Sequence, residues 1–216
     1  GLGQVTTADG KALKDEFDLV LSYDYENLST SIESTAKDLK GQLQDAGFGA
    51  DDKTKLTILA HSMGGLVSRE MIENGGGGDF IDHLVMCGTP NGGTPLGQIK
   101  MARNAAKILT TVAISAFPPA AAFGGALISA LKTSEKVTPT LEQMSPNSNF
   151  IKGLKRSEVP ATVRYTAIGG DVRSYEDPND GMFDKLMTKT GGATGLLFDG
   201  AHDICCSRDS MFDVQG

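Results

Sequence analysis

The feature that most constrains this sequence is a serine between a short apolar run and a helix-like segment. Residues 56–60 have the length and the β-branched content of a buried strand. Residues 65–73 follow as a predicted helix, which ends at Asn74-Gly75. Ser62 lies between the two elements, with the small residues Ala60 and Gly64 on either side. Such a turn needs small flanking residues because strand and helix crowd its backbone, so we expect a tight strand-turn-helix unit here.

The same kind of unit recurs along the chain. An amphipathic helix is predicted from Ser29 to Gly47, where apolar residues recur at steps of three and four. Four further apolar runs are typical of strands: Phe17 to Tyr23, Ile81 to Cys87, Thr162 to Ile168 and Gly195 to Phe198. Strands that alternate with helices predict a three-layer α/β domain with a mostly parallel sheet, whose loops gather at the carboxyl ends of the strands.

Composition agrees with one globular domain over residues 1–216. The chain is 39% hydrophobic and 22% charged, which excludes a disordered chain and a polytopic membrane protein. A formal net charge of −7 argues against nucleic-acid binding, which needs clustered Lys and Arg. Cys87, Cys205 and Cys206 are too few for a disulfide framework or a zinc site, so we interpret them as reduced, which favours the cytoplasm. Because the chain begins with Gly1 and not with Met, we expect a piece of a longer polypeptide.

An uncharged stretch separates the third predicted strand from the fourth. Residues 108–131 carry no charged side chain, and that length would suit a transmembrane helix. Pro118-Pro119 and Gly124-Gly125 interrupt it, which favours two short apolar helices. A membrane span, a buried helical hairpin and a mobile apolar cap over a pocket remain as alternatives. We take the cap as the leading interpretation, as a helical insertion at about residues 99–147.

Two motifs carry a resemblance to a known family. They are Ala-His-Ser-Met-Gly-Gly-Leu-Val-Ser-Arg at 60–69 and Val-Met-Cys-Gly-Thr-Pro-Asn-Gly-Gly-Thr-Pro-Leu-Gly at 85–97. From about Phe17 to Met211 the chain resembles the lipase-like α/β-hydrolases, in particular GPI-inositol-deacylase-like and lecithin:cholesterol-acyltransferase-like esterases. The resemblance implies an α/β-hydrolase fold, with the Thr-Pro-Asn-Gly-Gly-Thr-Pro loop near Ser62. In one bacterial branch of this family the hydrolase is a module of a larger protein.

The strand-turn-helix pattern also predicts catalytic roles. It would place Ser62 Oγ at the top edge of the sheet as a nucleophile, and the Met63 N–H could donate to an oxyanion. A triad then needs an acid later in the chain, and Asp171, Asp180 and Asp203 compete for that role. The resemblance favours Asp203, because His-Asp-Ile-Cys-Cys-Ser-Arg-Asp-Ser-Met is similar to the family pattern around its catalytic acid.

The catalytic histidine is harder to assign, since the chain offers His61, His83 and His202. We expect His61, beside the serine, to point away from Oγ, and His83 to be a structural residue of a strand. His202 lies in the right loop and is our candidate base. In the family the histidine comes some way after the acid, and a first strand with a His-Gly loop comes earlier; neither segment is recognisable here.

Two hypotheses of different class follow. In the first, the chain is a serine esterase or lipase-like enzyme in which Ser62, His202 and Asp203 form the triad and Met63 holds the oxyanion, without a metal or organic cofactor. Its substrate would be an acyl ester or a lipid, with transient contact to a lipid surface. A peptidase or thioesterase would use the same triad. In the second, the chain is a catalytically incomplete hydrolase-like module that serves as an interaction domain of a larger protein.

Overall fold

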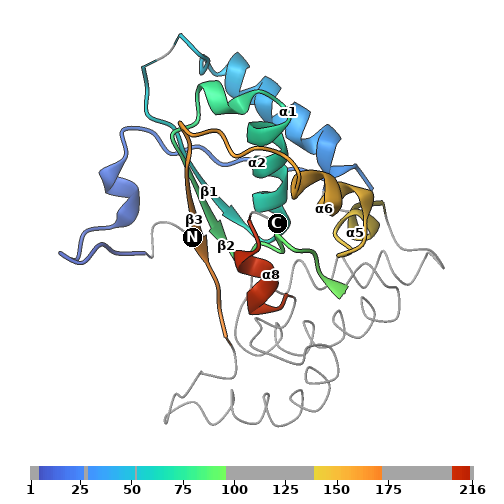
Figure 1. Ribbon diagram of the computed structural model, residues 1–216. Helices are drawn as coiled ribbons and strands as arrows, with labels where there is room; N and C mark the ends of the chain where they lie inside the picture. Colours follow the sequence, from blue (N-terminus) through green and yellow to red (C-terminus); the bar gives the residue numbers. More distant parts are fainter. Residues whose placement is uncertain (1–4, 27–28, 52, 96–138, 172–205, 215–216) are drawn as a thin grey trace, which may run out of the picture.

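A parallel sheet of three strands forms the centre of the described structure (Figure 1). The computed structural model describes residues 5–26, 29–51, 53–95, 139–171 and 206–214. The strands are β1 (Thr57–His61), β2 (His83–Cys87) and β3 (Arg164–Ile168), in the order β1-β2-β3. All neighbours are parallel. Three of the predicted strands are therefore confirmed to within two residues at each end.

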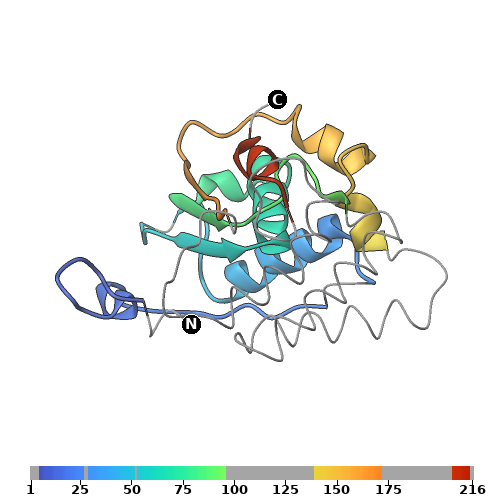
Figure 2. The same cartoon turned by 90° about the horizontal axis from the view of Figure 1, so that it is seen from below.

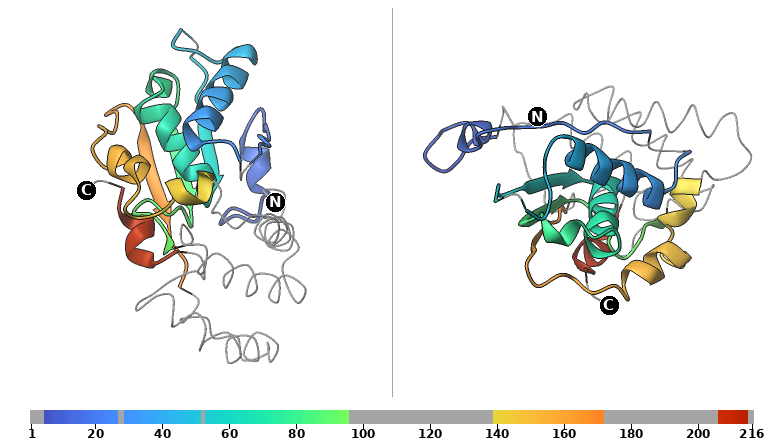
Figure 3. Two further views of the ribbon diagram at one scale, coloured as in Figure 1. Left: turned by 90° about the vertical axis from the view of Figure 1, so that its right-hand side faces the viewer. Right: turned by 90° about the horizontal axis from the view of Figure 1, so that it is seen from above.

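Two long helices form the layer on one face of this sheet. Helix α1 (Ile32–Asp45) begins at Ser31, whose side chain accepts a hydrogen bond from the Ser34 N–H at 3.2 Å. Helix α2 (Met63–Glu73) packs on β1 and β2, and α1 packs beside α2 (Figure 3). The apolar residues of both helices and the strand residues that face them form one core: Ile32, Ala36, Leu39, Ala60, Leu66, Val67, Met71, Ile72, Leu84 and Met86. Both helices were predicted, the first from Ser29 to Gly47 and the second from Gly65 to Glu73.

Short elements complete the described part of the chain. They are the 3-10 helices η2 (Leu13–Glu16) and η3 (Gly77–Asp79) and the α-helices α5 (Pro139–Gln143), α6 (Asn149–Leu154) and α8 (Arg208–Phe212). Helix α5 falls inside the insertion expected at 99–147, yet Leu141 is buried and Thr140 Oγ1 donates to the Thr30 carbonyl at 2.7 Å. The last residues of that expected insertion thus pack in the core.

The strand predicted at residues 17–23 is wrong. This segment is irregular and pairs with no other strand among the described residues. Leu19 is 63% exposed and Leu21 is 54% exposed. Figure 2 shows the segment running past the sheet on the side of β1. An apolar run becomes a strand only when a neighbour pairs with its backbone, and no described strand pairs with residues 17–23.

Strand β1 is an edge strand in the described structure. It pairs with β2 on one side, and on its other side no described residue pairs with it. Leu59 points away from the helical layer and is 47% exposed, and Ile168 on β3 is 52% exposed. The face of the sheet opposite α2 is therefore only partly covered by the described residues, and of the three predicted layers these residues show two.

Two further predictions fall on residues outside the described ones. The fifth strand, Gly195 to Phe198, lies there, as do residues 108–131 and most of the expected cap. Within the described ranges, every helix is too short or too polar to cross a lipid bilayer.

Candidate active site

The backbone of Ser62 is strained. This residue joins β1 to α2 with φ 53° and ψ −128°, and it is the one non-glycine residue with positive φ among those described. A backbone in such a region costs about 1–3 kcal/mol and persists where the surroundings hold it. Here the Ser62 N–H donates to the Cys87 carbonyl at 2.9 Å, and the Ser62 carbonyl accepts from the Gly65 N–H at 3.1 Å. The predicted turn is thus held by β2 on one side and by α2 on the other.

Small residues surround this turn. A Cβ atom on Gly64 would lie 3.9 Å from the Ala60 Cβ, an ordinary contact distance, so the two flanking positions face each other at close range. Gly65 is under a tighter constraint, because its Cβ would lie 2.0 Å from Thr89 Oγ1. Thr89 belongs to the loop after β2 and is buried. The sequence analysis did not single out Gly65, although a second glycine inside a helical pattern is a signal of close packing.

The first turn of α2 presents backbone donors beside Ser62. The N–H groups of Met63 and Gly64 have no backbone acceptor among the described residues. The start of a helix also carries a partial positive charge. An oxygen that becomes negatively charged at the Ser62 side chain would find these donors already oriented. Met63, the predicted oxyanion donor, is the first residue of this helix.

Of the remaining candidates for the catalytic acid and base, the described residues include Asp171. Asp180, His202 and Asp203 lie outside the described residues, so their roles stay predictions. Asp171 follows β3 at its carboxyl end, the edge of the parallel sheet at which Ser62 lies. Strand β2 separates β3 from β1. In the part of the chain described here, no three His, Cys, Asp or Glu side chains form a cluster that could bind a metal ion.

Two histidines can be placed. His83 is the first residue of β2, whereas Cys87 at its other end is in register with His61 beside the serine. At about 3.3 Å per residue, four residues of strand separate His83 from the serine edge by about 13 Å. His83 Nε2 instead forms a hydrogen bond with Thr166 Oγ1 at 2.8 Å, as a structural residue would. Burial lowers the pKa of His83, and the neighbouring Arg164 lowers it further. His61 is exposed on β1.

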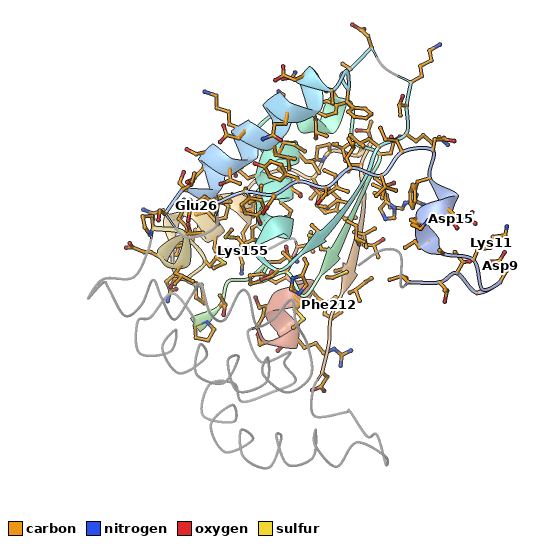
Figure 4. All side chains as sticks on the ribbon, turned by 180° about the vertical axis from the view of Figure 1, so that it is seen from behind. Asp9, Lys11, Asp15, Glu26, Lys155 and Phe212 are labelled. Carbon is orange, nitrogen blue, oxygen red and sulfur yellow. The ribbon has the colours of Figure 1, made fainter. Side chains whose placement is uncertain are left out.

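The loop after β2, residues 88–95, packs tightly against α8. Asn91 is fully buried, and its side-chain N–H donates to the Met211 carbonyl at 2.6 Å. The Gly92 N–H donates to the Ser210 carbonyl at 2.9 Å, and the Gly88 N–H that opens the loop donates to β3. Helix α8, with Phe212 at its end, lies near the carboxyl ends of the strands (Figure 4). Residues 88–95 of the motif thus form a closely packed loop that begins beside the serine turn.

A buried ion pair on α2 forms hydrogen bonds with the loop after β2, with β3 and with the residues after α8. Arg69 and Glu73 lie one turn apart on α2, both side chains are fully buried, and Arg69 Nε donates to Glu73 Oε1 at 2.7 Å. Arg69 Nη1 donates to Asn91 Oδ1 at 3.2 Å, and Nη2 donates to the Val214 carbonyl at 2.8 Å. The Tyr165 hydroxyl on β3 donates to Glu73 Oε1 at 3.0 Å. Sequence reasoning missed this pair, although its i, i+4 spacing was a signal.

Together, the parallel sheet, the helical layer and the strained serine turn define a lipase-like α/β-hydrolase fold. The mature lipase BlEst2 of Bacillus licheniformis is similar, with 14% sequence identity and a TM-score of 0.52 over 87% of this chain and 64% of that chain. Phospholipase PlaB from Legionella pneumophila gives 14% identity and a TM-score of 0.48 over 77% of this chain and 35% of that chain. The chain thus spans less than two thirds of the length of either enzyme.

The family model described as Domain of unknown function (DUF7379) matches residues 3–216, and the chain belongs to that family. No curated protein matches the chain in sequence.

Proposed function

We propose that this chain is a serine hydrolase module that cleaves carboxylic esters of acyl chains or lipids. The observation that carries the proposal is the positive φ of Ser62 in the turn between β1 and α2. Strain of this kind gathers at functional sites. The free N–H groups at the start of α2 add an electrostatic reason for a reaction at this place. The fold shared with the Bacillus licheniformis lipase supports the same class of reaction.

The proposed mechanism uses the residues singled out in the sequence. Ser62 Oγ attacks the ester carbonyl carbon while His202 accepts its proton and Asp203 orients the imidazole. The Met63 N–H donates to the oxyanion, a contribution of about 3–4 kcal/mol for one such donor. The histidine then gives its proton to the leaving alcohol, and a water molecule hydrolyses the acyl-enzyme by the same steps. Asp171 is the alternative acid. The scheme requires no metal ion or organic cofactor.

The substrate class rests on the apolar stretch at residues 108–131. We propose that this stretch belongs to a helical insertion at about residues 99–147, within one domain over residues 1–216. As a cap over the site, it would bury acyl chains better than small polar esters. Contact with a lipid surface would then deliver the substrate. The finer proposal is an enzyme of the GPI-inositol-deacylase-like or lecithin:cholesterol-acyltransferase-like kind, as one module of a larger polypeptide.

A fluorophosphonate probe tests the nucleophile. We expect the chain to be labelled, and we expect Ser62→Ala to lose the label. The control is Ser68→Ala. Ser68 lies on α2, where its Oγ donates to the Gly64 carbonyl at 2.8 Å, so we expect the Ser68→Ala variant to be labelled like the wild type. Label that persists in Ser62→Ala would overturn the assignment. Turnover of p-nitrophenyl esters that rises with acyl length would support the lipid class, and a preference for acetate would contradict it.

The second candidate function is a catalytically incomplete module that acts as an interaction domain of a larger protein. It is favoured by the position of His83 at the far end of β2 from the serine turn. Ester turnover separates the two functions. If turnover is present and disappears in His202→Ala, His202 is the base. If a folded chain shows neither turnover nor phosphonate label, the interaction domain is favoured.

A further inference from the structure

The hydroxyl group of Tyr25 lies against the first turn of α2. Tyr25 Oη is 3.4 Å from the position that a Cβ on Gly64 would occupy. Gly64 is the second residue of that helix and directly follows Met63, the proposed oxyanion donor. We propose that Tyr25 is a catalytic residue whose hydroxyl donates a second hydrogen bond to the substrate carbonyl oxygen at Ser62. This inference rests on the proposed hydrolase function.

The Tyr25 hydroxyl has no hydrogen-bond partner among the described residues, although its ring is held firmly. The ring stacks on Tyr23 with centroids 5.2 Å apart and packs at the margin of the core. The Tyr23 hydroxyl, by contrast, donates to the Thr35 carbonyl on α1 at 3.2 Å. Among the described residues only Thr89 Oγ1 is both fully buried and without a partner, so the Tyr25 hydroxyl is reached by solvent. A substrate oxygen beside the helix start would take the place of water at this hydroxyl.

The chemistry of the phenol fits a donor better than a base. Burial raises the pKa of Tyr25 to about 12, with smaller contributions from Tyr23 and Asp24. Tyr25 therefore keeps its proton at every pH at which an ester assay is run. Its O–H is held in place before the reaction, as an oxyanion donor must be, so no reorganisation is needed when the negative charge develops.

Two donors serve the reaction better than one. An oxyanion has three lone pairs, and the hydrogen bond proposed from the Met63 amide satisfies one of them. An O–H group on a fixed ring can reach the same oxygen from the side of the helix where Gly64 leaves room. A Cβ on Gly64 would just reach contact distance with the phenol oxygen, at 3.4 Å, so this side of the helix start has no side chain between the phenol and the backbone.

The test compares Tyr25→Phe with Tyr23→Phe in the full chain. Tyr25→Phe removes a hydroxyl without a partner, so we expect the same melting temperature, an unchanged KM and a kcat for p-nitrophenyl esters about 10²-fold lower. Tyr23→Phe keeps its ring but loses a hydrogen bond on α1, so we expect a lower melting temperature and an unchanged kcat. A trifluoromethyl ketone inhibitor, which forms an oxyanion on the serine, should lose affinity for Tyr25→Phe by a similar factor.

The outcomes separate this inference from the proposed function. A wild-type chain that neither hydrolyses ester nor reacts with the phosphonate probe overturns both. An active wild-type chain with wild-type kcat and inhibitor affinity in Tyr25→Phe overturns the role of Tyr25 alone. A drop in kcat that is matched by a drop in melting temperature would also overturn it, because it would show that the hydroxyl acts on the fold.

Discussion

Two glycines in the interiors of helices should respond to alanine with opposite sign. A methyl group on Gly65 would lie 2.0 Å from Thr89 Oγ1, 2.6 Å from its Cγ2 and 2.8 Å from its Cβ. Carbon atoms pack at about 3.5–4.0 Å, so either helix α2 or the loop must move by more than an ångström. Thr89 is 1% exposed and cannot turn into solvent. Overpacking costs up to about 3 kcal/mol and alanine returns about 1 kcal/mol in helix propensity, so we expect Gly65→Ala to lose about 2 kcal/mol.

Gly41, inside α1, is the matched control. No atom lies within 4 Å of the position that its Cβ would occupy, so Gly41→Ala gains the helix propensity without a clash. We expect it to be more stable than the wild type by about 0.5–1 kcal/mol. Equilibrium unfolding in urea, monitored by circular dichroism, should therefore shift the midpoint of Gly65→Ala downward and that of Gly41→Ala upward.

A double variant identifies the cause. Thr89→Ala removes the two nearest clashing atoms and leaves the Cβ at 2.8 Å, so Gly65→Ala with Thr89→Ala should recover part of the loss. Residues in contact are expected to deviate from additivity. If Gly65→Ala is as stable as the wild type, or if the two substitutions are simply additive, the packing argument is refuted.

Two further predictions concern buried and titrating groups. Arg69→Ala leaves Glu73 buried without its partner, and we expect a loss of about 3–5 kcal/mol in urea unfolding, whereas a loss below 1 kcal/mol would contradict the role of the pair. His83 has a pKa below its ordinary value of 6.5, so as pH falls below 6.5 the unfolded chain binds a proton before the folded chain does, and stability is lost. His83→Gln should remove this loss in melting temperatures recorded between pH 8 and pH 5, and equal slopes for the two proteins would count against it.

Local sequence patterns were enough to predict three strands, the two long helices and the turn at Ser62. The runs that became β1, β2 and β3 are short, apolar and bounded by turn residues, and the same property predicts their burial. The tight turn at Ser62 followed from two small flanking residues, a signal contained within five positions. Residues 17–23 share the strand pattern but pair with nothing in the described structure, because pairing depends on a neighbour that periodicity does not report.

Contacts between segments that are distant in the sequence could not be predicted from local patterns. The constraint on Gly65 comes from Thr89, and the buried Arg69 binds Asn91 and Val214, all of which the fold brings to α2 from later segments. The free hydroxyl of Tyr25 is likewise a property of packing. The acid and the base of the proposed triad, Asp203 and His202, rest on the sequence alone.

Among the described residues no strand pairs with the outer edge of β1, and this edge has a consequence for the behaviour of the protein in solution. An unpaired strand edge near exposed apolar side chains, here Leu59 together with Leu19 and Leu21, is a template for pairing with the edge of another molecule. Association of this kind depends on concentration, whereas folding of one chain does not. The yield of monomer on refolding should therefore fall as protein concentration rises, and the exposed side chains of Leu19, Leu21 and Leu59 mark where aggregation would begin.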